Sequence, residues 1–271
     1  MKQIGFISDL HVDSSPRHEA NEFFSTLVQV MHDRRLDGLI IGGDITNHYS
    51  TTLNFVERLQ TAAGIPVYFI PGNHDFWEIE ARTKHTHDVY DIFQQHPQSL
   101  MEKPLKISDQ YSIVGHPGWY NHTYHDPRFS KEELEVGKYR MATWQDKVHT
   151  DWQITDPELS KLFAGKVEQD LLKVQTEKII LVTHVITIPE FTIPMPHKIF
   201  DFFNAYIATD DFNSIYEKFD IEYSMMGHVH FRGKVTRDGT NFITNSLGYQ
   251  KEWRSSEIYR EISQSLWVIN V

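Results

Sequence analysis

Five short motifs carry side chains of the types that bind metal ions, and each motif follows an apolar run. They are Asp9-Leu10-His11, Gly43-Asp44, Gly72-Asn73-His74-Asp75, Thr183-His184 and Gly227-His228-Val229-His230. Carboxylate, amide and imidazole groups are suitable ligands for divalent cations, and this set is large enough for two ions. One such motif alone is most often a turn or a helix cap. Five in this order indicate a binuclear metal centre, and therefore the hydrolysis of phosphate esters.

The spacing within the motifs supports a shared site. Asp9 and His11 are two residues apart, so an extended chain presents both on the same side. Asp44 follows Gly42 and Gly43, and small residues allow the backbone to come close to a bound group. Because a carboxylate has two oxygens, Asp44 is suited to bridge two cations.

The composition limits the classes of substrate. Among the 271 residues, 26 Lys and Arg stand against 37 Asp and Glu, which gives a net charge of −11. Binding a nucleic-acid backbone requires clustered positive charge, so a general nucleic-acid binder is disfavoured. The chain has no cysteine, which excludes thiolate ligands and leaves His, Asp, Glu and Asn to hold any metal.

The sequence shows no signals that direct a protein to a membrane. It has no stretch of about 18 consecutive apolar residues, so we expect no membrane span. The N-terminus leads directly into a strand-like segment and lacks the apolar core of a signal peptide. From these missing signals we expect a cytoplasmic protein. The oligomeric state has no signature in the sequence.

Short apolar strands alternating with helices must position the motifs. Strands are predicted at residues 3–7, 38–41, 66–70, 111–114, 178–182 and 222–226, and helices at residues 17–33, 50–63 and 157–176. Strands are again predicted at 232–236, 241–245 and 266–271, with a hairpin turn at Asp238-Gly239. This order indicates a mostly parallel sheet with an antiparallel addition, whose ligands bind at the carboxyl ends of the strands. All five motifs fall at such ends.

We expect one domain over residues 1–271. The stretch at about 76–175 is the main irregularity, because it separates the third motif from the fourth and contains one predicted strand, which ends in a Gly115-His116-Pro117-Gly118-Trp119-Tyr120 run. The rest of this stretch is predicted to be helical and loop material that covers the site.

The ordered motifs resemble those of the calcineurin-like metallophosphoesterase superfamily, and they span residues 9–230. The resemblance implies an α/β fold, a four-layer αββα sandwich of two mixed β-sheets flanked by helices, with a dimetal site at the carboxyl ends of the strands. It implies that Asp9, His11, Asp44 and His230 bind one metal, and that Asp44, Asn73, His184 and His228 bind the other. The cofactors expected are two divalent or mixed-valence ions, chosen among Mn, Fe, Zn and Ni.

The mechanism expected for such a centre is in-line displacement at phosphorus by a hydroxide that bridges the two metals. The resemblance implies that His74 is the catalytic imidazole, which protonates the leaving alkoxide. We expect Asp75 to assist catalysis by orienting His74 and favouring its protonated form.

Two segments are candidates for contacts with a small phosphorylated substrate. After the strand at 111–114, His116 and Trp119 are expected to form a wall and Arg128 to meet a phosphate, although a loop packed on the core would explain the same residues. Residues 189–207 are rich in apolar side chains, which favours a pocket flap or a subunit contact, with ordinary core packing as the alternative.

The preferred function is a metal-dependent phosphoesterase. A phosphodiester is slightly favoured over a monoester, because no cluster of Arg or Lys flanks the motifs to bind a second negative charge. One alternative is a metal-binding scaffold of the same fold without catalysis, which would be expected to have lost ligands or His74. Another is a nuclease, which needs a basic track that the sequence does not display.

Overall fold

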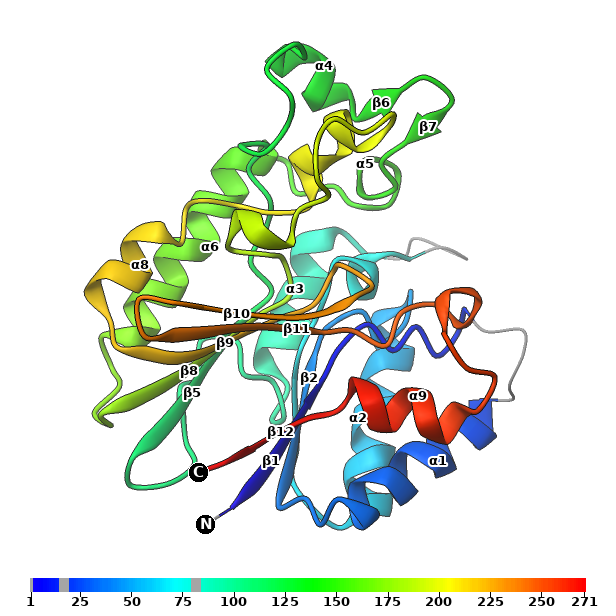
Figure 1. Cartoon of the computed structure of the whole chain (residues 1–271), viewed down its shortest axis with the longest axis vertical. Helices are drawn as coiled ribbons and strands as arrows, with labels where there is room; N and C mark the ends of the chain where they lie inside the picture. The colour runs from blue at the N-terminus through cyan, green and yellow to red at the C-terminus, as the bar shows by residue number, and fades with distance from the viewer. Residues whose placement is uncertain (1, 15–19, 79–83) are drawn as a thin grey trace.

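Two β-sheets pack against each other at the centre of the computed structural model, which describes residues 2–14, 20–78 and 84–271 (Figure 1). The first sheet has the strand order β12 (Trp267–Asn270), β1 (Gln3–Ile7), β2 (Gly38–Gly42) and β3 (Val67–Ile70). The second has the order β10 (Arg232–Arg237), β11 (Thr240–Asn245), β9 (Ile221–Met226), β8 (Lys178–Thr183), β5 (Tyr111–His116) and β4 (Leu105–Lys106). Each sheet is parallel at its centre, while β12, β10 and β4 run antiparallel to their neighbours. Both sheets are therefore mixed.

Helices cover the outer face of each sheet. Against the first sheet lie α1 (Ala20–Asp33), α2 (Tyr49–Ala63) and α9 (Ile258–Ser265), and against the second lie α6 (Asp156–Leu171) and α8 (Asn213–Lys218). A further helix, α3 (Thr86–Gln95), packs on β3 through Phe93 and Phe69. The chain thus has the four αββα layers that were expected, which confirms the predicted fold.

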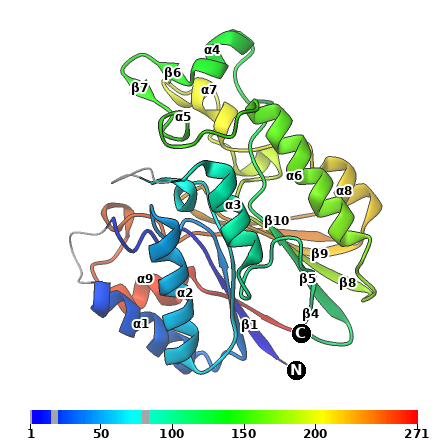
Figure 2. The same cartoon turned by 180° about the vertical axis from the view of Figure 1, so that it is seen from behind.

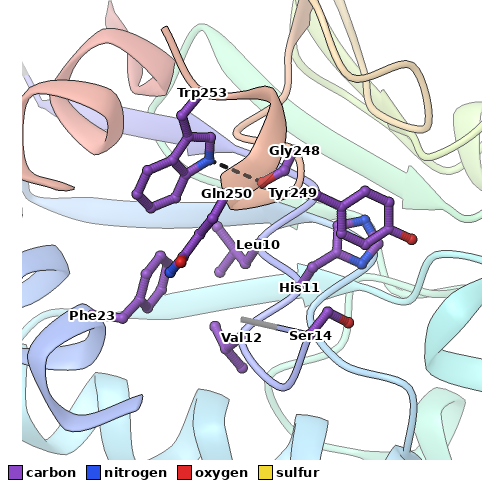
Figure 3. A pocket seen from close by; sticks show the side chains of 9 residues that line it. All are labelled: Leu10, His11, Val12, Ser14, Phe23, Gly248, Tyr249, Gln250 and Trp253. Carbon is purple, nitrogen blue, oxygen red and sulfur yellow. Dashed lines mark hydrogen bonds between the residues drawn. The ribbon is translucent and has the colours of Figure 1, made fainter. Parts of the chain in front are cut away.

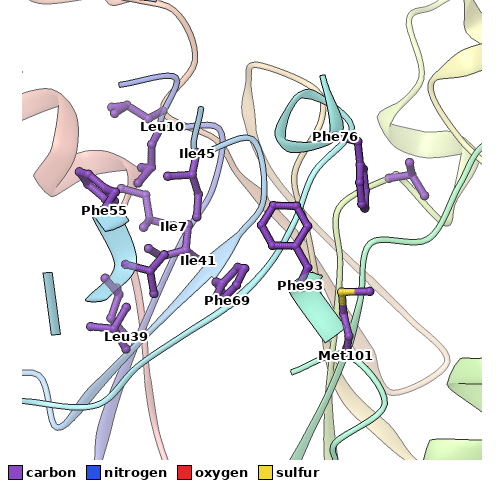
Figure 4. Close-up of a cluster of buried hydrophobic side chains, with 14 of the residues drawn as sticks. Ile7, Leu10, Leu39, Ile41, Ile45, Phe55, Phe69, Phe76, Phe93 and Met101 are labelled. Atoms are coloured by element: carbon purple, nitrogen blue, oxygen red, sulfur yellow. The ribbon is translucent and has the colours of Figure 1, made fainter. Parts of the chain in front are cut away.

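The alternation of side chains along the strands explains why both faces are covered. On β2, Leu39 and Ile41 point into the apolar cluster shared with the helices, and Ile40 points into the cluster between the two sheets. Figure 4 shows the helix-side cluster, in which the side chains of Ile7 and Ile41 lie beside Phe55 of α2. Strands covered on both faces read as continuous apolar runs, which is the pattern that predicted them.

Local signals set the ends of several elements. Thr155 and Glu158 form a capping box at the start of α6, since each side chain accepts a hydrogen bond from the other residue's backbone N–H. The helix ends at Leu171, five residues before the predicted end. At the β10–β11 hairpin, Asp238 and Gly239 have φ of 51° and 88°, as a tight hairpin turn requires.

A cap lies beyond the strand ends, and we define it as residues 131–149 together with residues 189–207. Its elements are α4 (Lys131–Val136), β6 (Lys138–Tyr139), β7 (Ala142–Thr143), α5 (Asp146–His149), η2 (Pro189–Phe191), α7 (Phe200–Phe203) and η3 (Asn204–Tyr206). The two segments lie together in both views (Figures 1 and 2). Their contact includes the rings of Tyr139 and Phe202, whose centroids are 5.2 Å apart.

Only part of the predicted cover at 76–175 lies in the cap. The rest belongs to the sandwich, because β5 is an inner strand of the second sheet and α6 packs on that sheet. Within the residues that the structure describes, no helix has the length and apolar character needed to cross a membrane.

Candidate metal centre

The five motifs meet where parallel strands of the two sheets end. Asp9 follows β1, Asp44 follows β2 and Asn73 follows β3, all in the first sheet. His184 follows β8 and His228 follows β9 in the second sheet, and the N–H of Gly227 donates to the carbonyl of His184 at 2.9 Å. Because the two sheets pack together, the carboxyl ends of strands from both sheets come to one place.

Asp9, His11, Asp44 and His230 form the first group of converging side chains, with ligand atoms that lie within 4.8 Å of one another. The Nε2 atoms of His11 and His230 are 3.1 Å apart. Nε2 of His11 lies 3.7 Å from Oδ2 of Asp44, and Nε2 of His230 lies 3.7 Å from Oδ1 of Asp9.

The second group shares Asp44 with the first and adds His184 and His228, again with ligand atoms within 4.8 Å of one another. Oδ1 of Asp44 lies 3.3 Å from Nε2 of His184. Oδ1 of Asn73 lies 3.0 Å from Nε2 of His184 and 3.0 Å from Nδ1 of His228. Asp44 therefore stands between the two groups, with one oxygen toward each.

Hydrogen bonds on the outer sides of the rings orient the histidines. Nδ1–H of His184 is placed to donate to the carbonyl of Gly42 at 2.9 Å, and Nε2–H of His228 to the carbonyl of Tyr206 at 2.9 Å. Nδ1 of His230 lies 2.8 Å from Oε2 of Glu252. With the proton on the outer nitrogen, the inner nitrogen of each ring presents a lone pair to the group.

The donor set fits cations. In the second group, the inner ring nitrogens of His184 and His228 face the amide oxygen of Asn73. All three atoms are hydrogen-bond acceptors, and a positive ion between them would remove their mutual repulsion. Although burial lowers the pKa of His184, the Asp44 carboxylate raises it to about 9, so this ring binds a proton where it does not bind a metal. Nδ1 of His11 is buried and makes no hydrogen bond to the described residues. The field at this point of the molecule attracts positive charge.

The backbone is strained at the same residues. Asp9, His11, Asp44 and His228 have φ of 56°, 42°, 53° and 68°, a region that non-glycine residues rarely adopt. Each such residue costs about 1–3 kcal/mol, and such strain gathers at functional sites. Close packing adds to it, since a Cβ on Gly72 would lie 2.2 Å from Oδ1 of Asp44.

The two groups and Asn73 are together called the metal-ligand cluster below. His74 lies at its edge. Its backbone N–H donates to Oδ1 of Asp44 at 2.9 Å, and its Nε2 lies 3.9 Å from Oδ2 of Asp44. Nδ1–H is placed to donate to Oδ1 of Asn47 at 2.8 Å, and the ring packs on Trp77 with centroids 3.6 Å apart. Burial lowers the pKa of His74 to about 4.

The expectation that Asp75 orients His74 was wrong. The buried Asp75 carboxylate accepts hydrogen bonds from N–H of Gly72 at 2.7 Å, N–H of Thr46 at 3.0 Å and Oγ1–H of Thr52 at 2.6 Å. Asp75 thus ties the loop after β3 to the loop after β2, and Asn47 holds the position beside the imidazole.

A large cavity of about 770 Å³ opens over the metal-ligand cluster. Its lining includes Asp44, Asn73, His74, His228 and His230 from the strand ends, and Trp77, Trp144, Tyr249 and Glu252 around them. The cap contributes the apolar side chains Ile193, Ile199, Phe200, Phe203 and Ile207. The interpretation of residues 189–207 as a pocket flap agrees with this position.

The substrate wall expected from His116 and Trp119 was wrong, because neither residue lines this cavity. Both are 1% exposed. Nε2 of His116 lies 3.0 Å from the hydroxyl of Tyr90, and Nε1–H of Trp119 donates to Asp156 at 2.9 Å. Arg128 also lies outside the lining and pairs with Asp201 at 2.6 Å.

A small second cavity of about 10 Å³ adjoins His11 on its outer side (Figure 3). Figure 3 shows the ring of Tyr249 stacked on that of His11, with centroids 4.3 Å apart. Tyr249 and Glu252 flank the first group of ligands, and neither was predicted from the sequence. No motif marks them, since they lie at the short 3-10 helix η4 (Gln250–Glu252) after β11, far along the chain from the first motif.

The sequence matches the calcineurin-like phosphoesterase family over residues 2–232, so the chain belongs to this family. It is 25% identical over 181 residues to the UDP-2,3-diacylglucosamine hydrolase of Vibrio cholerae serotype O1, covering 59% of this chain and 73% of that protein. The phosphopantetheinyl hydrolase of Mycobacterium tuberculosis superposes with a TM-score of 0.79 at 18% identity, over 98% of this chain and 95% of that one. A dimetal phosphatase from Danio rerio superposes with a TM-score of 0.52 at 12% identity, over 90% of this chain and 86% of that one.

Family membership gives the class of reaction. Its members are dimetal-dependent phosphohydrolases, and this chain has a matching cluster of Asp and His side chains. The chain is therefore a metal-dependent phosphoesterase.

Proposed function

We propose that the chain is a phosphodiesterase with two metal ions, one held by Asp9, His11, Asp44 and His230 and the other by Asp44, Asn73, His184 and His228. The observation that carries this proposal is the pair of ligand groups that share Asp44. Nitrogen and oxygen ligands without thiolates suit Mn, Fe, Zn or Ni.

Two cations held by these residues would lower the pKa of a bound water and neutralise charge on the phosphate oxygens. The side chains around them do the rest. Asn47 fixes the tautomer of His74 by accepting from Nδ1–H, so Nε2 is the atom that exchanges a proton with the substrate. Burial lowers the pKa of His74 to about 4. A phosphate anion beside Nε2 raises that pKa, so the ring gains the proton that it passes to the leaving oxygen when substrate binds.

The preference for a diester follows from the charges around the cavity. Among the described residues that line it, none is Lys or Arg. A monoester carries a second negative charge that has no cationic side chain to meet it there, whereas a diester carries one charge that the metals neutralise. A nuclease is disfavoured for the same reason, since it needs cations along its groove.

The test uses metal-stripped protein resupplied singly with Mn, Fe, Zn, Ni or Mg. We expect turnover of bis-p-nitrophenyl phosphate to exceed that of p-nitrophenyl phosphate and to require metal. Asp44→Ala should abolish turnover and bind neither metal, whereas Asp170→Ala, which removes a buried carboxylate on α6 outside the site, should keep two metals. Two bound metals without turnover of either ester would support the scaffold instead, and cleavage of supercoiled DNA would support a nuclease.

A further inference from the structure

The side of the large cavity that faces the metal-ligand cluster is formed by the cap and is mainly apolar, with Thr143 and Gln145 as its polar members. Ile193, Ile199, Phe200 and Phe203 come from one segment of the cap, and Trp144 comes from the other. Figures 1 and 2 show both segments above the carboxyl ends of the strands. A phosphate held by metals at the strand ends would therefore direct one of its substituents toward this apolar wall.

The charges in the lining exclude a highly charged substituent. Asp44 and Glu252 are the acidic residues of the lining, and its described part contains no Lys or Arg. A second phosphate or a carboxylate on the substituent would therefore find no Lys or Arg in the described lining to pair with it. Burying an unpaired charge is unfavourable, whereas an uncharged group enters such a cavity freely.

The two tryptophan rings in the lining are already packed on other protein rings. Trp77 lies on His74 with centroids 3.6 Å apart and planes inclined by 32°, and Trp144 lies on Tyr206 with centroids 5.1 Å apart and planes inclined by 15°. A nucleobase is bound by stacking on open aromatic faces. The two indoles therefore offer little free stacking surface, and the side chains of Ile193, Ile199, Phe200 and Phe203 beside them suit an uncharged aliphatic substituent.

Further apolar side chains are exposed on the two segments of the cap. Ile199 lines the cavity and is 39% exposed, Met195 in the same segment is 47% exposed, and Met141, next to the lining residue Ala142, is 98% exposed. Exposed apolar side chains on segments that form an apolar cavity favour the binding of apolar ligands there.

We propose that the substrate is a monoanionic phosphodiester with one uncharged aliphatic chain, which lies on Ile193, Ile199, Phe200 and Phe203. This proposal rests on the proposed phosphodiesterase function and names its substrate class. The metal-ligand cluster binds the phosphate, and the cap selects the chain.

The first experiment compares methyl, butyl and octyl p-nitrophenyl phosphate with the metal-loaded protein. All three are monoanionic diesters with the same leaving group, so they differ only in the chain. We expect kcat/KM to rise by roughly two- to fourfold for each methylene that reaches the wall. A chain of matched length that ends in a carboxylate should lose this gain.

Two variants test where the chain lies. Ile199→Ser and Phe200→Ser place polar groups in the wall and should flatten the dependence of kcat/KM on chain length. Both positions are at least partly exposed, so the fold tolerates the change. The matched control is Leu172→Ser, which replaces a 65% exposed apolar residue that lies after α6 and does not line the cavity. It should keep the wild-type dependence.

A binding measurement separates this proposal from the proposed function. Calorimetry with dimethyl and dibutyl phosphate should show tighter binding and a more negative heat-capacity change for the longer chains, and both effects should weaken in Ile199→Ser. Turnover of the methyl diester without any dependence on chain length would overturn the aliphatic class while leaving the phosphodiesterase. A dependence that survives both wall variants would also overturn it. Absence of turnover with all five metals would contradict the proposed phosphodiesterase activity. The calorimetry would then test only whether the apolar wall binds an aliphatic chain.

Discussion

The side-chain amide of Asn73 donates to Oδ1 of Asp146 at 2.9 Å, which joins a residue of the metal-ligand cluster to helix α5 of the cap. Asp146 is fully buried and also accepts from Nε1–H of Trp77 at 2.7 Å, Nε1–H of Trp144 at 2.9 Å and O–H of Tyr120 at 3.0 Å. Because the amide nitrogen of Asn73 is held in this way, its oxygen is turned toward His184 and His228. The cap and the metal centre are therefore one connected structure.

Asp146→Asn should weaken the second metal site. The new amide group places N–H donors against the donors of the indoles and of Asn73, so the Asn73 amide loses its fixed orientation. We expect a fall of roughly 10- to 100-fold in metal affinity or in kcat/KM. Metal content by mass spectrometry should drop from two ions toward one. Asp170→Asn is the matched control, since Asp170 is also buried but pairs with Lys173 near the end of α6, outside the cluster. Equal metal content in both variants would contradict the link.

His74→Ala should keep both metals and lose activity. The ring contacts Asp44 only at 3.9 Å, and its hydrogen-bond partner is Asn47, so its removal leaves the metal ligands in place. Loss of a general acid lowers kcat by roughly 100- to 10,000-fold. Full activity with both metals bound would remove this role.

Asn47→Asp should shift the pH profile. A carboxylate beside Nδ1 favours the protonated ring, so it raises the pKa of His74 from the value of about 4 that burial imposes. A step that needs protonated His74 then continues to higher pH, so the alkaline limb of the kcat/KM profile shifts to higher pH. Asn47→Ala removes the partner without adding charge and should lower kcat without that upward shift. Identical profiles for the wild type and Asn47→Asp would show that Asn47 does not act through His74.

Gly72→Ala should empty the centre without removing a ligand. The added Cβ would lie 2.2 Å from Oδ1 and 2.4 Å from the backbone nitrogen of Asp44, so the shared ligand must move. We expect both metals to be lost together, read out as metal content. Gly165→Ala is the control, because its Cβ meets nothing within 4 Å on α6. That change should raise stability by roughly 0.5–1 kcal/mol, as removal of an interior helix glycine does. Two metals retained in Gly72→Ala would contradict the packing argument.

The convergence of the motifs could be predicted because it follows from the topology of the sheets. Asp9, Asp44 and Asn73 each follow a strand, and neighbouring parallel strands end at one edge of a sheet. The layers could be predicted for a similar reason, since apolar runs and helical periods repeat over whole elements. Both inferences use spacing along the backbone and need no knowledge of a single side chain's direction.

Contacts between side chains could not be predicted in the same way. Asp75 follows His74, yet adjacent side chains of the short turn at His74–Phe76 point to different partners. His116 ends β5, and its position near the site does not show that its ring faces α6, where it lies 4.5 Å from the ring of Phe163. Asp146 lies 73 residues from Asn73, and no motif marks it. These contacts depend on packing between distant segments.

His116 should make the protein less stable in acid, as a buried core histidine does. Nδ1 accepts from N–H of Gly118 at 3.2 Å, so Nε2–H donates to the Tyr90 hydroxyl at 3.0 Å and the ring is neutral. Burial, aided by the charge of Lys166, lowers the pKa of His116 from 6.5 to about 3. The pKa of His116 is lower in the folded protein than in the unfolded chain. The stability that neutral His116 contributes is therefore fully present above about pH 6.5 and is lost as the pH falls toward 3, by about 2 kcal/mol at pH 5. Chemical denaturation with a chelator present throughout should show that the difference between the wild type and His116→Gln shrinks from pH 7 to pH 5. The control is His32→Gln, since His32 is exposed, and it should show no such change. If the difference between the wild type and His116→Gln stays constant with pH, His116 is not buried in its neutral form.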